Sequence, residues 1–495
     1  MIPRCLALFL PIVLAAGCLV GPTYRRPATE VPAAYREQPP AATAGGVVWK
    51  AARPADAARR TPWWRVFDDA ELDALMDKVV VSNQTLALAE AQYRAARAAV
   101  LGVRASLFPT VGVAGSATPS GGISTRSPGP GQAAPEITTY EIAASLGWEI
   151  DLFGRIRRSV EASVAGAMAS AADLENVRLA LQAEAAVDYF LLRGQDAAIQ
   201  LLEKTAAGYQ AELDLTENRY KQGVASGIDV SQARAQLAST RAQVADLKIA
   251  RAQLEHALAV LAGRAPQGLA IAAVEFKATP PEIPAGVPSE LLERRPDVAA
   301  SERRLAAANA QIGVAVAGYF PTLSLNGLGG YESSALSSLF TLPERIWSLG
   351  ASLAESIFAG GKRKAAYEQA RAAYDGTVAQ YKEAVLEAME QVEDNLAALR
   401  LLDEESRLQA VAVTESERTL SLAKNRYLNG ISSYLEVVTA QNTALSNERV
   451  AVGLLTRQLT TSVNLIKALG GGWRSSDLAA PDASPAGPAP AAARK

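Results

Sequence analysis

The stretch from Tyr140 to Leu152 restricts the fold of this chain more than any other part of the sequence. Apolar residues, among them Trp148, occupy its even positions, whereas its odd positions carry Glu, Ala, Ser, Gly and Asp. This period of two predicts a β-strand with one apolar face and one polar face. Directly after Gly154 the pattern becomes a long alanine-rich run without proline, which predicts a very long helix.

The distribution of proline extends this prediction to the rest of the chain. The 495 residues include 26 prolines, but none lies between Pro135 and Pro266 or between Pro343 and Pro481. Because proline breaks the interior of a helix, both intervals are expected to hold long helices. Within the first interval, apolar residues keep a seven-residue repeat after the predicted turn, which is typical of a coiled coil. The predicted helices cover residues 154–222, 228–262, 361–429 and 434–468, and the first would be on the order of 100 Å long.

The two halves of the sequence are copies of each other. Three motifs recur in the same order, at separations of 212, 206 and 207 residues. Recurrence in a fixed order indicates an internal two-fold repeat rather than chance similarity among alanine-rich segments. The paired motifs are Leu107–Thr110 with Tyr319–Thr322, Gly154–Arg157 with Gly360–Arg363, and Asn218–Gly223 with Asn425–Gly430. We expect a first repeat at 62–265, a Pro-rich connector at 266–288 and a second repeat at 289–473, each repeat opening with a helix.

Each repeat holds two predicted strands, at about 109–117 and 140–152 in the first and at about 322–331 and 346–357 in the second. Small polar residues on one face and apolar residues with Tyr and Trp on the other are typical of a transmembrane β-barrel. A soluble β-sandwich is the alternative, although it usually carries more strands at shorter intervals. Four strands cannot close a water-filled barrel, so the chain is expected to assemble with copies of itself into about 8, 12 or 16 strands.

The N-terminus predicts export and attachment to lipid. Arg4 precedes an apolar run, small residues follow, and Ala15-Ala-Gly-Cys18 resembles a bacterial lipobox, so residues 1–17 are a predicted secretory signal and Cys18 the lipidated residue. Alanine stands at position 15, where leucine is commonest, and an ordinary signal peptide with an incidental Cys18 is the alternative. Residues 18–61 are rich in Pro, Ala and Arg and read as an extended tether, and 474–495 as a disordered Ala/Pro tail.

Composition argues against several classes of function. A formal net charge of −2 disfavours nucleic-acid binding. His256 is the sole histidine, and Cys18 is the sole cysteine once the signal is removed, so neither a His-based metal or catalytic cluster nor an intrachain disulfide is expected. We therefore predict no enzyme activity, no metal and no cofactor. After Cys18 no window offers the roughly 20 apolar residues of a membrane helix, so a membrane crossing would require a barrel.

Several motifs together resemble the outer membrane factor family of tripartite efflux systems, of the OprM/NodT lipoprotein type and more distantly TolC. They are the lipobox with Cys18–Tyr24, the two Phe-Pro-Thr strand openings, Trp148–Arg155, Glu293–Asp297 and the two Arg-Tyr-x-x-Gly turns. The resemblance runs from Cys18 to about Trp473. It implies a mainly α fold with a transmembrane β-barrel in the cell outer membrane. The family forms a homotrimer, in which four strands per chain make a 12-stranded barrel that a 12-helix coiled-coil α-barrel continues through the periplasm. The implied partners are outer-membrane lipid, a periplasmic adaptor (membrane fusion) protein and an inner-membrane efflux pump.

The turns between the long helices form the first predicted site. Gly223 and Gly430 allow the left-handed backbone that ends a helix, and an arginine one turn earlier suits the negative end of the helix dipole. The resemblance implies that these tips contact the adaptor, whereas capping and packing alone are the alternative, and one residue can do both. The predicted tip residues are Arg219, Tyr220, Gly223, Ser226, Arg426, Tyr427, Gly430 and Ser433.

The start of the last helix is the second predicted site, a periplasmic gate. Relatives often read Tyr-Leu-x-x-Leu-Asp-Ala-Gln-Arg there, and by that match Leu435 supplies an apolar ring. Thr439 replaces the aspartate and Asn442 the arginine, so both charged groups of an inter-subunit ionic lock are missing. Glu436 matches an aspartate of the TolC branch. Three such carboxylates near one axis would repel each other and attract cations; alternatively Glu436 only solvates the first turn of its helix.

The resemblance implies a passive exit duct for drugs or other small solutes, which draws its energy from a partner. A duct for type I protein secretion has the same architecture and differs in cargo. A periplasmic coiled-coil scaffold lipoprotein, which would lack strands that face lipid, belongs to a different class. A lipoprotein enzyme is the weakest of the four hypotheses, because the sequence holds no recognisable catalytic cluster.

Overall fold

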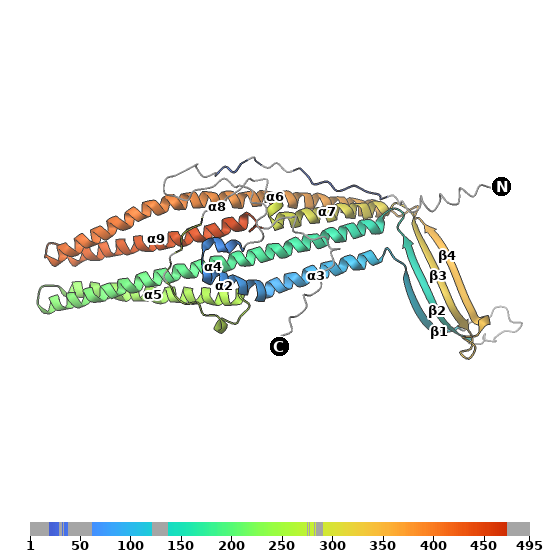
Figure 1. The fold of residues 1–495 in the computed structure, drawn as a ribbon, viewed down its shortest axis with the longest axis horizontal. Helices are drawn as coiled ribbons and strands as arrows, with labels where there is room; N and C mark the ends of the chain where they lie inside the picture. Colours follow the sequence, from blue (N-terminus) through green and yellow to red (C-terminus); the bar gives the residue numbers. More distant parts are fainter. Residues whose placement is uncertain are drawn as a thin grey trace, which may run out of the picture.

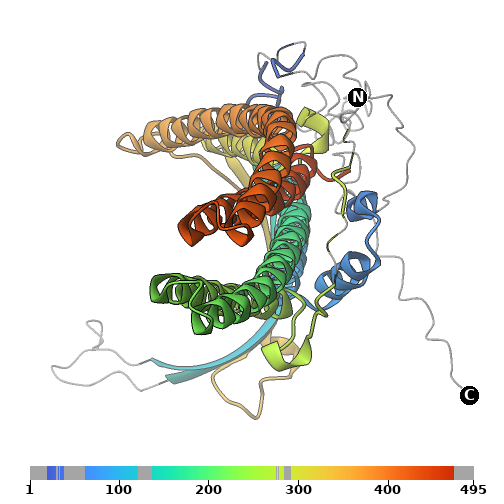
Figure 2. The same ribbon diagram turned by 90° about the vertical axis from the view of Figure 1, so that its left-hand side faces the viewer.

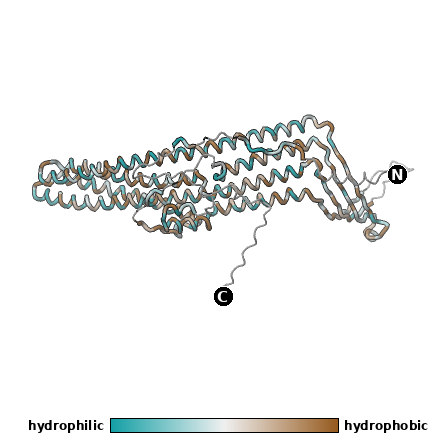
Figure 3. The backbone as a smooth tube through the Cα atoms, turned by 45° about the horizontal axis from the view of Figure 1, so that its top comes forward, coloured by the Kyte–Doolittle hydropathy of each residue, from teal (hydrophilic) through white to brown (hydrophobic). Residues whose placement is uncertain are grey.

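The computed structural model describes residues 19–28, 32, 34–37, 62–120, 137–274, 276, 278–281, 283 and 291–472. The predicted signal at 1–17, Cys18, most of the tether and the tail at 474–495 lie outside these residues. The described part is elongated, with long helices at one end and a sheet at the other (Figure 1). Among the described residues, no helix has both the length and the apolar composition that a membrane span requires (Figure 3).

Two pairs of antiparallel helices make up most of the length. α4 (Arg155–Lys221) and α8 (Lys362–Leu428) contain 67 residues each, and α5 (Gly227–Leu261) and α9 (Tyr434–Ala468) contain 35 each. Every bound lies within one residue of the range expected from the sequence. The N-cap residues of α4 and α8 are the glycines 154 and 361, whose φ angles of +81° and +88° suit glycine.

Shorter helices cover the other half of each long helix. α3 (Gln84–Ala105) packs on α4, and α7 (Pro296–Ala317) packs between α4 and α8. α2 (Ala70–Ser82) begins at Asp69, whose carboxylate accepts from two backbone amides, and α3 begins at Asn83, which also donates to the Leu261 carbonyl at the end of α5. The one-turn elements are η1 (Trp63–Phe67), η2 (Pro266–Gly268), α6 (Leu291–Arg294) and η4 (Leu342–Glu344).

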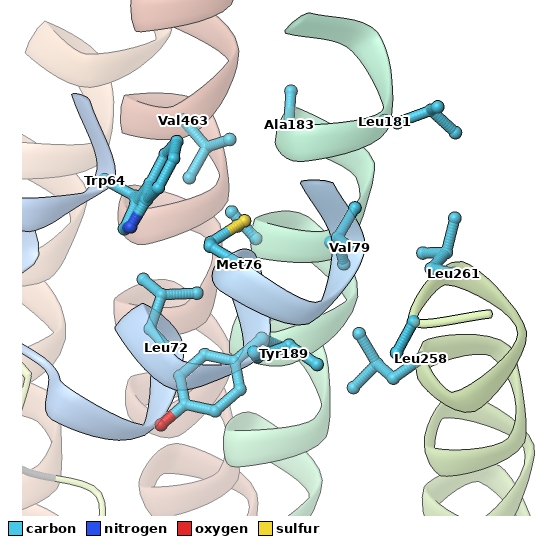
Figure 4. Close-up of a cluster of buried hydrophobic side chains, with 14 of the residues drawn as sticks. Trp64, Leu72, Met76, Val79, Leu181, Ala183, Tyr189, Leu258, Leu261 and Val463 are labelled. Carbon is cyan, nitrogen blue, oxygen red and sulfur yellow. The ribbon is translucent and has the colours of Figure 1, made fainter. Parts of the chain in front are cut away.

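The largest apolar core lies midway along the helices, where η1 and α2 pack against α4, α5 and α9 (Figure 4). Leu72 and Met76 of α2 are fully buried there, and the Tyr189 hydroxyl of α4 donates to Asp69 over 2.7 Å. Full burial of a side chain such as Leu or Met stabilises a fold by about 1.5–3 kcal/mol. Large side chains therefore concentrate at this level, while alanine lets the helices approach closely elsewhere.

The sheet has four antiparallel strands in the order β1-β2-β3-β4. They are β1 (Thr110–Ser120), β2 (Ile137–Ile150), β3 (Thr322–Ser333) and β4 (Arg345–Ala354). The fold is thus mainly helical with one four-stranded antiparallel sheet per chain, which confirms the coarse prediction of fold class. Within the described chain, β1 and β4 each have one edge without a strand partner.

The register separates an apolar face of the sheet from a polar one. One row across the four strands contains Val111, Leu146, Gly327 and Leu349, and the adjacent row contains Thr110, Gly147, Asn326 and Gly350. Side chains alternate along each strand, so the apolar and polar rows point to opposite sides of the sheet. The face pattern predicted for Tyr140 to Leu152 therefore continues over the neighbouring strands.

The end of β4 differs from the sequence prediction. We expected a strand to residue 357, but β4 ends at Ala354, which pairs with Thr322 at the start of β3. Pro321 precedes Thr322 and has no amide to donate, so β3 offers no partner for Glu355 to Ile357. The other three strands extend two or three residues beyond at least one predicted end.

The described part of the predicted tether packs on the helices rather than extending freely. The Val20 amide donates to the Phe153 carbonyl, and the Arg158 guanidinium donates to the carbonyls of Val20 and Gly21. Farther along, the Tyr24 hydroxyl donates to Glu302 of α7 over 2.7 Å. The amides of residues 36 and 37 donate to Glu393 of α8. Hydrogen bonds from and to its backbone, together with that of the Tyr24 side chain, thus fix this segment along α4, α7 and α8.

Candidate functional site

Both helical hairpins end in the same kind of turn, and the two hairpins lie next to each other when viewed end-on (Figure 2). The Gly223 amide donates to the Tyr220 carbonyl and the Val224 amide to the Arg219 carbonyl, both over 2.9 Å. In the second hairpin the amides of residues 430 and 431 donate to the carbonyls of residues 427 and 426. The two glycines have φ angles of +74° and +73°, which close these Schellman-type ends.

The residues that follow the turns differ between the hairpins. Ser226 and Asp229 form a reciprocal capping box at the start of α5, with bonds of 3.2 and 3.0 Å. Ser433 makes no side-chain cap at the start of α9. Glu436, in the position that would complete such a box, instead lies 3.4 Å from the Arg426 Nε atom. A predicted gate residue is therefore paired with a predicted tip residue of the same hairpin.

Arg219 links the two hairpins at their tips. Its guanidinium lies over the ring of Tyr427 at 5.1 Å from the centroid, and its Nη1 atom donates to the Leu428 carbonyl over 3.5 Å. The Tyr427 ring in turn lies 5.2 Å from the buried ring of Tyr434. Cation–π contacts of this kind contribute about 0.5–1 kcal/mol at exposed sites. Arg219 and Tyr427 therefore connect α4 to α8 in addition to ending their own helices.

Glu212, seven residues before Arg219 in α4, forms a second link between the two hairpins. Its carboxylate accepts a hydrogen bond from the buried Gln441 and lies 2.5 Å from the Lys424 Nζ atom. Burial raises the pKa of the Tyr434 hydroxyl, and the neighbouring Glu212 carboxylate raises it further. The seven-residue spacing from Arg219 places both side chains on one face of α4, and this spacing could have revealed Glu212 in the sequence.

The predicted gate residues lie along the first turns of α9. Leu435 is 58% exposed, and the Thr439 hydroxyl donates to the Leu435 carbonyl over 2.8 Å. Asn442 accepts a hydrogen bond of 2.6 Å from Gln236 of α5. The Asn442 amide therefore joins α9 to α5.

The tips also expose large apolar side chains. They come from both turns and from the helix ends beside them. A group of exposed apolar side chains on a protein surface that faces water usually marks a contact with another molecule. The exposed residues are Tyr220, Val224, Ile228, Leu428, Ile431 and Leu435.

The family is given by comparison with known proteins. The family model described as "Outer membrane efflux protein" matches residues 75–264 and 287–471. The chain belongs to the outer membrane efflux protein family. This efflux protein is located in the cell outer membrane and is the outer-membrane exit duct of an efflux system. Its family is one of channels rather than a known enzyme family.

Relatives match almost the whole length of this efflux protein. It is 33% identical over 473 residues to the toluene efflux pump outer membrane protein TtgC of Pseudomonas putida, covering 94% of this chain and 95% of that protein. The solved outer-membrane channel OprN has a TM-score of 0.82 at 33% identity, covering 92% of this chain and 100% of OprN. The MtrE channel of Neisseria gonorrhoeae, solved in an open state, has a TM-score of 0.78 at 28% identity, covering 92% and 99%.

Away from the tips, the efflux protein holds a buried ionic network. Asp196 of α4 is almost fully buried and accepts from Arg193 over 3.1 Å and from Arg251 of α5 over 2.6 Å. The two arginines also donate to the carbonyls of Ala272 and Ile271 in the connector. This network fixes the connector to α4 and α5. Within the described ranges, no three His, Cys, Asp or Glu side chains are grouped so that they could hold a metal ion.

Proposed function

We propose that three copies of this efflux protein form one passive duct for drugs or other small solutes. Three four-stranded sheets would join edge to edge into a 12-stranded barrel in the outer membrane, and the helices would form a 12-helix α-barrel in the periplasm. A periplasmic adaptor would open the tips and connect the duct to an inner-membrane pump. The internal two-fold repeat would then give this trimer six similar units around its axis.

The observation that carries the proposal is that, among the described residues, the sheet has two edges without a strand partner and one apolar face. Unpaired backbone amides and carbonyls cannot be left exposed to hydrocarbon, because each unsatisfied group costs several kcal/mol there. Pairing between β4 of one copy and β1 of the next would satisfy both edges at once. The apolar face would then contact lipid, and the Thr, Ser, Gly and Asn face would contact water.

The cargo in this proposal follows from the relatives. TtgC is named as a toluene efflux protein, and the family description names efflux. A duct lined by small polar residues accepts small solutes without a dedicated binding site, so selectivity would lie with the pump.

The gate in this proposal is the set of contacts that hold α8 and α9 against α4 and α5. Arg219 with Tyr427 and Gln236 with Asn442 join the two hairpins near the tips. An adaptor that binds the exposed apolar tip residues would break these contacts and move the hairpins apart. Leu435, Glu436, Thr439 and Asn442 would line the aperture before it opens, and the Arg426 partner of Glu436 would limit repulsion between the three carboxylates.

Lipidation at Cys18 completes the proposal. Cys18 lies outside the described residues, but Leu19 packs against Gly154 and the Val20 amide bonds to the Phe153 carbonyl. These contacts hold the following residues at the junction of sheet and helix. An acyl chain on Cys18 would therefore begin close to the membrane end of the helices, where it could insert in the same bilayer as the sheet.

The proposal is tested by expressing the full-length chain, extracting it in detergent, measuring the mass of the particle and imaging single particles. We expect trimers with a barrel at one end and a tapered helical end. Deletion of the gene should also lower resistance to small toxic solutes. A monomer in detergent, or trimers whose loss changes no solute resistance, would refute the duct.

A further inference from the structure

The two halves of the chain pair their strands in the same register. Thr110 and Thr322 open β1 and β3, 212 residues apart. The N-cap glycines of α4 and α8 are Gly154 and Gly361, so the structural separation here is 207 residues, one more than the motif match in the sequence. Adding 212 to a β1 residue and 207 to its β2 partner converts the pair Thr110↔Gly147 into Thr322↔Ala354. The same shifts convert every later pair of β1 with β2 into the observed pair of β3 with β4, as far as β4 extends.

The contact between β2 and β3 joins the first half to the second. Its counterpart after the same shifts would join β4 to a β1 strand, but these two strands lie at opposite edges of the sheet. The strand pairing of the repeat can continue beyond β4 only if another molecule supplies a β1 strand beside it. A second copy of this chain supplies a strand with the required sequence and direction.

We propose that β4 pairs with the β1 strand of the next copy in the register that the repeat dictates, an inference that rests on the closed ring proposed above. Shifting the pairs of β2 with β3 places Ser352 opposite the partner subunit's Ser116 and Ile357 opposite the partner subunit's Val111. This ladder runs from Ser348 of β4 to Ile357, three residues beyond the end of β4 in the single chain.

The early end of β4 supports this register. Glu355 to Ile357 correspond to Trp148 to Ile150, the part of β2 that pairs with β3 alone and extends beyond the first residue of β1. These three residues would therefore join the strand only when the next copy is present. Ile357 is 98% exposed in the single chain, and Val111, the residue expected opposite it, is 70% exposed.

The chemistry of the paired residues supports it as well. In this register serine lies opposite serine on the polar face, and alanine lies opposite alanine on both faces. The apolar face and the polar face therefore both continue across the seam, the contact between β4 and the β1 strand of the next copy. A shift by one residue would turn the apolar side chains of β4 toward water. Glu355 opposite the partner subunit's Val113 is the one pair that departs from the pattern, at the helical end of the seam.

Cysteine cross-linking of the full-length protein in outer membranes tests the register. Ser352→Cys with Ser116→Cys places the thiols directly opposite, within reach of a disulfide, whereas a two-residue shift separates them by about 7–8 Å. The shifted controls combine Ser352→Cys with Ala114→Cys or Thr118→Cys, on the same face. The matched control is Ser145→Cys with Leu328→Cys, the equivalent pair between β2 and β3 of one chain.

On mild oxidation, the pair 116/352 should give covalent dimers and trimers on denaturing gels, at a yield at least about fivefold above either shifted pair. The pair 145/328 should oxidise within one chain and remain monomeric. Ala117→Cys with Ala351→Cys, on the opposite face, should behave like 116/352. Stronger interchain cross-linking by a shifted pair would overturn the register while leaving the ring intact. Oxidation of 145/328 with no interchain product from any pair would overturn both the register and the ring.

Discussion

Gly223 and Gly430 have no side chain, yet their backbone angles end both hairpins. Both lie in the left-handed region, and no atom of the described residues lies within 4 Å of the position a Cβ would occupy. A substitution there would therefore strain the backbone without creating a clash, at a cost of roughly 1–2 kcal/mol per residue. This cost is small beside the stability of the whole helical region, so its effect should stay at the tip.

Replacement of either glycine by valine should abolish efflux and leave the amount of outer-membrane trimer unchanged, because the altered turn would no longer present Val224 or Ile431 correctly. Gly208→Val, inside α4 with open space around it, makes the same chemical change away from the turn and should retain efflux. Drug susceptibility and trimer content of the same cells are the measurements. Normal resistance in Gly223→Val and Gly430→Val would show that adaptor binding does not depend on these turns.

Asp188 of α4 gives a prediction about pH. Burial, together with the negative charge of Glu184 one turn away, raises the pKa of Asp188 to about 6. The folded chain thus holds this proton more tightly than the unfolded chain, whose aspartate titrates near pH 3.9. The stabilisation from the bound proton is present below about pH 4 and is lost as the pH rises through about 6.

Asp188→Asn should therefore raise the melting temperature of the purified protein at pH 7.5 but change it little at pH 4.5. Circular dichroism of the helices during heating gives the measurement, and Asp246→Asn on the exposed side of α5 serves as the control. An equal effect of Asp188→Asn at both pH values would show that Asp188 does not titrate in this range.

At the scale of elements, sequence reasoning succeeded where the signal is local and failed where it depends on a partner. The absence of proline and the two turn glycines are local, and the long helices lie within one residue of their predicted bounds. The end of β4 depends on the strand beside it, and the packing of residues 19–28 and 34–37 depends on the helices beneath them, so neither could be read from the sequence. The role of Gln236 likewise exists only once the hairpins lie side by side.

The link between α5 and α9 gives a prediction about closure. Gln236→Ala and Asn442→Ala each remove the hydrogen bond between these helices, which contributes about 0.5–1.5 kcal/mol per chain. Each variant should increase the entry of large antibiotics into cells, and the double variant should add little because both changes remove one bond. Susceptibility to an antibiotic too large for ordinary porins is the measurement.

The exposed Gln253→Ala on α5 is the control for these variants. Additive effects of Gln236→Ala and Asn442→Ala would show that the two side chains act separately. Unchanged permeability in both single variants and in the double variant would exclude this contact from the gate.

At the scale of the whole molecule, two different attachments tie the chain to the membrane in the proposed assembly. One is the lipid on Cys18, and the other is the closed ring of strands. The segment after Cys18 is also fixed to the protein itself, because Arg158 is buried and holds two of its carbonyls and Asn309 holds the carbonyl of Pro22. The lipid and the packed segment are therefore separable in their effects on assembly.

Replacing residues 1–18 by a cleavable signal without the cysteine should abolish incorporation of labelled palmitate while trimers and most efflux remain, because the sheet supplies the main burial in lipid. Removing residues 19–37 as well should lower the yield of trimer, since Tyr24, Arg36 and Glu37 then no longer bridge α7 and α8. Palmitate labelling, trimer content on gels and solute resistance are measured on the same cells. Loss of trimer in the first variant would mean that the acyl chain, rather than the packed segment, holds this end of the assembly together.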